Sequence, residues 1–227
     1  MAYRRTEAVA TRLADNRRRI LNAARELVAE GGFAHASMSA VAGRAQLATG
    51  TLYRYFPSKE ALFRQVFREV SLREMGLLRE IAQGDGPAAR RLALVVRRFA
   101  GRAVRGRRLA YALLAEPVDV GLAEERAAFR RTHAEIFAHI LADGARSGEL
   151  SVDNPQLAAA CIAGAIPTAL VGSLAPESHE LDRNSDAVIT SLVMFCLRAV
   201  GADPALAETE TTDIKIEDGE TQERAYA

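Results

Sequence analysis

A short stretch near the amino terminus carries hydroxyl groups and one lysine at regular spacing. Thr49, Thr51, Tyr53 and Tyr55 occur within seven residues, and Lys59 follows shortly after them. Such hydroxyls can bind phosphate oxygens or base edges, and a threonine methyl group can pack against thymine. A lysine in the first turn of a helix adds its charge to the helix N-terminus, which suits a phosphate. These residues therefore offer contact with nucleic acid.

Helices must position these side chains, and the spacing of apolar residues predicts four of them. Breakers and caps place them at about residues 16–30, 37–45, 49–56 and 58–84. Ser37 and Ser58 are the expected N-caps of the second and fourth helices, and Pro57 ends the third. Two short helices joined by a tight turn form a helix-turn-helix, in which Leu52 and Phe56 should face inward.

The third helix has the features of a recognition helix. Gly50 and Thr51 are small, so the backbone at its start can approach DNA closely. Tyr53 and Tyr55 lie about 200° apart around the helix and reach different parts of a groove wall. Two alternatives stay open, namely that either tyrosine is a core aromatic and that Thr49 is only a helix cap.

This pattern resembles the tetracycline-repressor (TetR) family of bacterial transcription regulators. The matching residues are Ile20-Leu21-Asn22-Ala23-Ala24, Gly32-Phe33, Ser37-Met38, Gly50-Thr51-Leu52-Tyr53-Arg54-Tyr55-Phe56 and Ser58-Lys59-Glu60-Ala61-Leu62. They cover about residues 16–67, and the rest of the chain agrees in helix count, length and pattern. The resemblance implies an all-α fold of about nine helices, with a three-helix DNA-binding head and a C-terminal helical domain for ligand binding and dimerisation.

The resemblance also implies which residues face DNA. The expected DNA-facing residues, with the small Gly50 added, are Ser37, Ser39, Thr49, Gly50, Thr51, Tyr53, Tyr55 and Lys59. The partner would be double-stranded operator DNA, an inverted repeat with half-sites about 34–36 Å apart. A solvated surface role for Lys59 stays open. Gln46 and Ala48 depart from the family pattern, and a glutamine where glycine is usual predicts a strained or reshaped turn.

The composition divides the chain into three parts. We expect a DNA-binding head over residues 1–57, a ligand-binding and dimerisation domain over 58–201 whose residues 58–84 connect it to the head, and an acidic disordered tail over 202–227. Residues 1–60 hold ten Arg or Lys against five Asp or Glu, whereas residues 202–227 hold two against eight. A basic head fits phosphate binding, with an arginine-biased genome as the simpler explanation.

Candidate effector-binding residues lie in the predicted helix from Val118 to Gly144. Phe129, His133 and Phe137 share one face, and Tyr111 lies on a short helix before it. A polar group on an apolar face indicates an anchor in the pocket of a mostly apolar small-molecule effector. The alternative is a core histidine bonded to a neighbouring helix.

Two further helices, over residues 155–174 and 187–200, are apolar almost all round. We expect them to form a homodimer interface, with Leu170 and Val193 in it; burial within one subunit is the alternative. Cys161 and Cys196 should be small core residues. The arginine-rich stretch at residues 90–105 should be a solvated face, with binding of an anionic effector as the weaker alternative.

The sequence argues for no catalytic, metal or cofactor site. It has no phosphate-binding glycine loop, nucleophile elbow or metal-ligand spacing. Few cysteines and no apolar run long enough for a bilayer favour a cytoplasmic protein without membrane contact. We therefore expect a DNA-binding transcription regulator, a repressor that a small molecule releases. The alternatives are a ligand-responsive activator and a helical protein-binding adaptor.

Overall fold

The computed structural model describes residues 2–203, although the side chains of residues 2–6, 180, 182 and 183 are not described. This part of the chain folds into nine α-helices and contains no strand, which confirms the predicted all-α class. The helices are α1 (Ala2–His35), α2 (Met38–Arg44), α3 (Thr49–Tyr55), α4 (Lys59–Gln83), α5 (Ala88–Arg105), α6 (Arg107–Leu114), α7 (Val120–Ser147), α8 (Pro155–Leu174) and α9 (Glu180–Ala199). The predicted tail lies outside the described residues, apart from Ala202 and Asp203.

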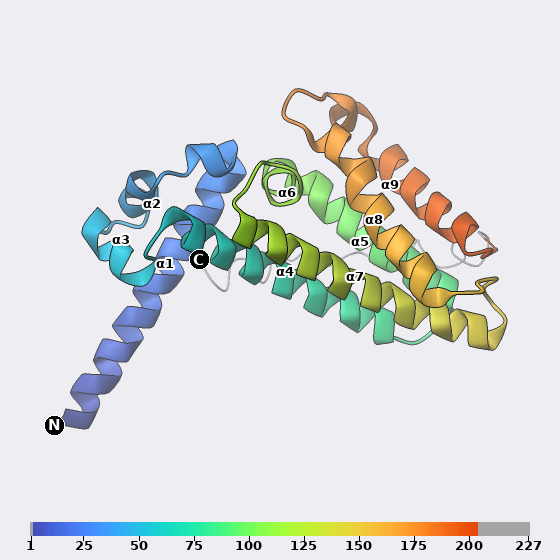
Figure 1. Ribbon diagram of the computed structural model, residues 1–227, viewed down its shortest axis with the longest axis horizontal. Helices are drawn as coiled ribbons and strands as arrows, with labels where there is room; N and C mark the ends of the chain where they lie inside the picture. Colours follow the sequence, from blue (N-terminus) through green and yellow to red (C-terminus); the bar gives the residue numbers. More distant parts are fainter. Residues whose placement is uncertain (1, 204–227) are drawn as a thin grey trace.

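The helices form a small head and a longer body (Figure 1). In the head, α1, α2 and α3 pack on the first half of α4 around one apolar cluster. The body holds a second cluster, to which the second half of α4 and helices α5 to α9 contribute. Helix α6 and the start of α7 also add Ala112, Leu113 and Leu122 to the head cluster. Head and body are therefore joined by packing as well as by the continuous helix α4.

Local sequence signals fix most helix ends. The Ser37 hydroxyl accepts a hydrogen bond from the backbone N–H of Ala40, and Ser58 accepts one from Ala61, as predicted. Asn154 caps α8 in the same way through the N–H of Leu157. Gly32 interrupts α1 with a φ of 77°, so glycine does end the main segment of this helix. The start of α1 differs, because the helix begins at residue 2 rather than near residue 16.

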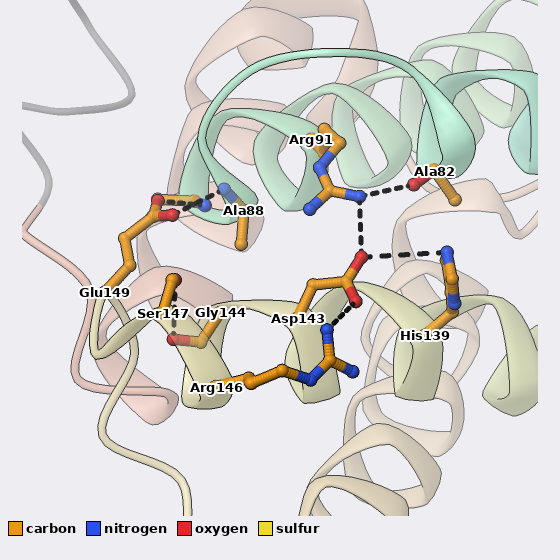
Figure 2. Close-up of polar contacts among 10 residues, drawn as sticks. Ala82, Ala88, Arg91, His139, Asp143, Gly144, Arg146, Ser147 and Glu149 are labelled. Atoms are coloured by element: carbon orange, nitrogen blue, oxygen red, sulfur yellow. Dashed lines mark hydrogen bonds and ion pairs between the residues drawn. The ribbon is translucent and has the colours of Figure 1, made fainter.

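A polar cluster fastens the far end of the body (Figure 2). The Glu149 carboxylate accepts hydrogen bonds of 2.7 Å from the backbone N–H groups of Ala88 and Ala89, and so caps α5 from another segment. Arg91 donates to the last-turn carbonyl of α4 at Ala82 and to Asp143 on α7. Burial alone would raise the pKa of Asp143, but hydrogen bonds from Arg91 and Arg146 lower it. These contacts hold α4, α5 and α7 together.

Helix α8 corrects the expectation about apolar length. By length and composition alone it could cross a membrane, a test that the core helices of other folds also pass. Its buried face contributes Ile162, Ile166 and Leu170 to the body core, and 44% of its most apolar window is buried. Its opposite face, which includes Leu157 at 61% exposure, has no covering element in the described chain. This open apolar face bears on assembly.

Candidate nucleic-acid interface and the helices behind it

The helix-turn-helix is held by the residues expected to hold it. Leu52 on α3 is fully buried and Phe56 at its end is 4% exposed, both within the head cluster. Arg44 at the end of α2 donates to Glu30 on α1 at 2.8 Å and to Glu26 at 3.4 Å. The short helices α2 and α3 are thus fixed on α1 by an apolar core with an ion pair at its edge, and α3 keeps one free side.

The outer face of α3 carries most of the predicted DNA contacts. Thr49, Gly50 and Tyr53 are exposed, and Thr51 is half-buried. A Cβ at Gly50 would meet no atom within 4 Å. The packing of the protein therefore does not require glycine here, and its small size matters only on the solvent side. Sequence reasoning missed Arg54, which is exposed and lies two residues along the helix from the buried Leu52. Arginine is the side chain that most often reads guanine in a major groove, so its place on this face was the available signal.

Two of the predicted contact residues are partly engaged within the protein. The Tyr55 hydroxyl accepts a hydrogen bond of 3.2 Å from the Asn16 amide of α1, and the Tyr55 ring packs on the head cluster. Lys59 is half-buried, with its Nζ 5.4 Å from the centre of the Phe63 ring. Both keep donor capacity, but Tyr55 also serves the packing of the head.

The turn between α2 and α3 behaves as its unusual residues predict. Gln46 adopts a φ of 54°, the left-handed region that glycine occupies without strain. Ala48 is the N-cap residue of α3 and supplies no side-chain bond, and Thr49 does not replace it because it already lies inside the helix. Ser37 and Ser39 are exposed, with their hydroxyls 3.0 Å apart.

A second link between head and body lies where α1 ends. Arg108 on α6 pairs with Glu116 at 2.6 Å and donates to the carbonyl of Gly31 at 2.7 Å. Glu116 in turn accepts a hydrogen bond from the backbone N–H of Phe33 at 2.8 Å. This α1–α6 contact adds a noncovalent connection to the covalent one that α4 provides. We call these four residues the α1–α6 latch.

His133 lies inside an aromatic cage in the body. It is 1% exposed, and its ring centre is 4.8 Å from Phe137, 4.9 Å from Phe99 and 5.9 Å from Phe129. Neither imidazole nitrogen has a hydrogen-bond partner within the described part of the chain, so the alternative of a histidine bonded to a neighbouring helix is wrong. Burial lowers the pKa of His133 to about 4, which keeps the ring neutral.

The cage connects to the head through further aromatic contacts. Phe129 packs edge-on against Phe67 of α4 at 5.9 Å, and Phe63, one turn earlier on α4, packs against Phe33 at 4.9 Å. Tyr111 is half-buried on the body cluster beneath Arg108, with the guanidinium 5.8 Å from its ring centre. The structure therefore brings Phe129, His133 and Phe137 together and places Tyr111 beside the α1–α6 latch.

The arginines of α5 are not a solvated face. Arg91 pairs with Asp143, and Arg102 lies 3.1 Å from Glu74, a carboxylate of α4 that is 5% exposed. Burial raises the pKa of Glu74 more than the nearby charges of Arg102, Arg98 and Arg105 lower it. The acids that these arginines need come from α4 and α7, which explains why α5 itself contains none.

The outer faces of α8 and α9 form an open surface of small and apolar residues. Its members are Leu157, Cys161, Gly164 and Thr168 on α8, and Ser191, Met194, Phe195 and Arg198 on α9. A shallow hollow of about 580 Å³ lies along α9 beside Phe195, which is 55% exposed. Cys161 is exposed, whereas Cys196 is buried and burial raises the pKa of its thiol to about 12. Leu170 and Val193 face the core of their own subunit, so their predicted place in an interface is wrong.

Among residues 2–203, with the undescribed side chains set aside, no group of three His, Cys, Asp or Glu side chains could hold a metal ion. The geometry instead defines a class: a helix-turn-helix head on a helical body that holds an apolar cage. Comparison with known proteins gives the family. Residues 20–66 match the family model described as bacterial regulatory proteins, tetR family.

Curated relatives match this chain over part of its length. The chain is 43% identical over 79 residues to the transcriptional regulator UidR of Escherichia coli K12, covering 35% of this chain and 38% of that relative. It is 56% identical over 45 residues to the transcriptional repressor KstR of Rhodococcus jostii RHA1, covering 20% and 21%. These matches thus span well under half of either relative.

The whole fold also has a solved counterpart. FadR of Bacillus subtilis in complex with stearoyl-CoA superimposes with a TM-score of 0.65 at 26% identity, over 77% of this chain and 96% of that one. The head, over residues 20–66, therefore matches the tetR family of bacterial regulatory proteins, and the described helices share the fold of FadR.

Proposed function

We propose that this protein is a homodimeric repressor that binds an inverted-repeat operator and leaves it when a small molecule binds the body. Residues 1–57 form the DNA-binding part, and residues 58–201 form the ligand-binding and dimerisation part. The observation that carries the proposal is the outer face of α3, where Thr49, Gly50, Tyr53 and Arg54 are presented together on a helix fixed from behind. Similarity to UidR and KstR supports the same activity.

Contacts divide by the chemistry of each side chain. Arg54 lies on the side of α3 opposite the buried Leu52, and Thr51 is half-buried beside it; both would read base edges in the major groove. Tyr53, Lys59 and the hydroxyls of Ser37 and Ser39 would bind phosphates around it. Tyr55 would hold α3 against α1 and donate its own proton to a phosphate. Thr49 and Gly50 would let the N-terminus of α3 approach the duplex.

The effector site would be the cage around His133. A neutral imidazole offers one donor and one acceptor, and both are unused in a fully buried position. Opening the cage to a mostly apolar molecule with a polar group would satisfy them, and Tyr111 would line the same site from α6. The stearoyl-CoA bound by the Bacillus relative supports an effector with a long apolar chain.

Two connections would carry the switch. A ligand that separates Phe129 from Phe67 would move the middle of α4, and one that displaces Tyr111 would disturb the α1–α6 latch. Either movement would change the separation of the two heads in the dimer. The ligand can weaken DNA binding only by the factor by which it binds the arrangement that does not fit the operator more tightly than the one that does.

The test of DNA binding is Gly50→Ala. The variant should fold as well as the native chain or better, since the added Cβ meets no atom and alanine favours a helix by up to about 1 kcal/mol. Its affinity for DNA selected by the native protein should fall, because the methyl group stands between the backbone and the duplex. The matched control is Gly43→Ala on α2, which also has open space but lies outside α3.

Fluorescence anisotropy with a selected duplex measures binding, and thermal unfolding measures stability. A Gly50→Ala variant that is stable and binds as tightly as native protein would remove α3 from the DNA interface. Selection of binding sites from genomic DNA fragments tests the proposed function as a whole. If the native protein binds none of these fragments, the proposed function is wrong.

A further inference from the structure

The first residues of α1 form an extension beyond the packed part of the head. Helix α1 starts at residue 2, yet among its described side chains the first polar contacts with the rest of the head are those of Asn16 and Arg17. Every described side chain from residue 7 to residue 15 is exposed. At about 1.5 Å per residue, residues 2–15 span about 20 Å. Figure 1 shows this segment projecting away from the body and past the helix-turn-helix. We call residues 2–15 the α1 extension.

One face of the extension continues the side of α1 that meets the helix-turn-helix. Asn16 donates to Tyr55 on α3, and Arg19 donates to the carbonyl of Ala45 in the turn after α2. Helical residues four or seven positions apart share a face. Arg12 lies four residues before Asn16 and seven before Arg19, so it shares a face with both. Arg12 therefore lies on the side of α1 that faces the candidate DNA surface, one to two turns farther out.

The sequence of the extension carries three arginines against two acids. Arg12 makes no ion pair with any described side chain, and the sequence adds Arg4 and Arg5 near the start of the helix. Of its two acids, Asp15 is already paired with Arg18, and Glu7 falls about half a turn away from Asn16 around the helix. A helix this short and unsupported is only marginally stable in water, so it gains most from a surface that orders it.

We propose that the α1 extension lies along the DNA backbone next to the half-site and binds phosphates there through its arginines. The occupant is duplex DNA, because the extension is basic and continues the proposed DNA surface of α2 and α3. The inference rests on the proposed function and enlarges it. Each subunit would contact the duplex beyond the bases that α3 can reach, and this added binding would not depend on sequence.

The test compares duplexes of two lengths. One duplex ends at the edges of the site selected by the native protein, and the other adds about ten base pairs of mixed sequence on each side. Native protein should bind the long duplex more tightly. The variant Arg4→Ala/Arg5→Ala/Arg12→Ala should lose that gain, about tenfold or more at moderate salt, with a salt slope smaller by about 0.9 for each phosphate that it no longer neutralises.

The matched control removes three exposed arginines from the body, Arg73→Ala/Arg79→Ala/Arg131→Ala, and so has the same net charge. It should keep the length dependence and the slope. If both triple variants respond alike, or if flanking DNA adds nothing to native binding, the extension does not bind DNA. A change in oligomeric state on Val9→Ser/Leu13→Ser, without any change in DNA binding, would assign it to contact between copies and overturn the proposal. An absence of all DNA binding by native protein would instead reject the proposed function.

Discussion

Arg54 is exposed on the outer side of α3, two residues along the helix from the buried Leu52. Its neighbours in the chain, Tyr53 and Tyr55, carry hydroxyls that can bind phosphates, whereas one arginine in an arginine-rich chain carries little signal. The predicted inward position of Leu52 already implied that Arg54 lies on the outer side of α3, and the burial of Leu52 bears this out. Tyr55 shows the converse, because its spacing predicted a DNA contact and the structure adds a packing role that spacing alone cannot reveal.

Arg54 should determine part of the operator sequence. In Arg54→Ala, we expect discrimination at one position of each half-site to fall by about 1–3 kcal/mol, the value of a bidentate contact to guanine. Arg54→Lys should keep affinity for mixed-sequence DNA but lose the discrimination, since lysine lacks the planar fork. Competition among single-base variants of the selected duplex measures this. Unchanged preferences in both variants would leave Arg54 as a phosphate contact or a solvated residue.

His133 predicts a pH dependence of stability. Its pKa is about 4 in the folded protein and about 6.5 in an unfolded chain, so between these values the unfolded state binds more protons. The free energy of unfolding therefore falls as pH drops from 6.5 toward 4, by up to about 3 kcal/mol from this residue. In His133→Phe that part of the loss should vanish, whereas His35→Gln, at an exposed histidine, should retain it.

Urea titrations across this pH range measure the effect. At pH 7 the Phe variant should be at least as stable as native protein, because two unsatisfied buried nitrogens are removed. Equal acid sensitivity in native protein and His133→Phe would contradict the buried neutral imidazole.

At the scale of elements, sequence predicts what is local. The caps at Ser37 and Ser58 involve residues within one turn of each other, so spacing alone predicted them. The partners of α5 lie on other helices, so a stretch without acids suggested a solvated face and not the ion pairs with Glu74 and Asp143. The α1 extension has no apolar stripe long enough to signal a helix.

The α1–α6 latch makes Gly32 a sensitive position. Gly32 has a φ of 77°, and a Cβ there would lie 2.1 Å from Glu116 and 2.2 Å from Arg108. Gly32→Ala should therefore lower the free energy of unfolding by about 1–3 kcal/mol and weaken the latch. Gly43→Ala, at a helical glycine with open space, should be neutral or stabilising. Thermal unfolding compares the two variants. Equal stability would show that Glu116 and Arg108 move aside for the added Cβ without destabilising the fold.

For the whole molecule, we propose that the open face of α8 and α9 forms the dimer interface. The sequence identified both helices as too apolar for one subunit but gave no direction, because a helix that is apolar all round has no marked side. Packing shows that Leu170 and Val193 point inward, while Leu157 and Phe195 point outward. Gly164, on the same face of α8 as Leu157, has open space around it and would let a helix of a second subunit approach closely.

A charge on this face should give monomers without unfolding the subunit. We expect Phe195→Glu to sediment as a folded monomer with weakened operator binding, since one subunit holds a single half-site. Leu72→Glu places the same charge on α4 at a residue that is 68% exposed, and it should stay dimeric. Analytical ultracentrifugation separates these outcomes, and a dimeric Phe195→Glu variant would place the interface elsewhere.

Backbone footprinting of the native protein on a selected operator tests the central claim most directly. Two recognition helices related by a two-fold axis should protect two symmetric major-groove segments, with centres about 34–36 Å apart. Effector should abolish both protections together. A single protected segment, protections without two-fold symmetry, or none on any selected duplex would contradict a dimer that reads DNA through α3.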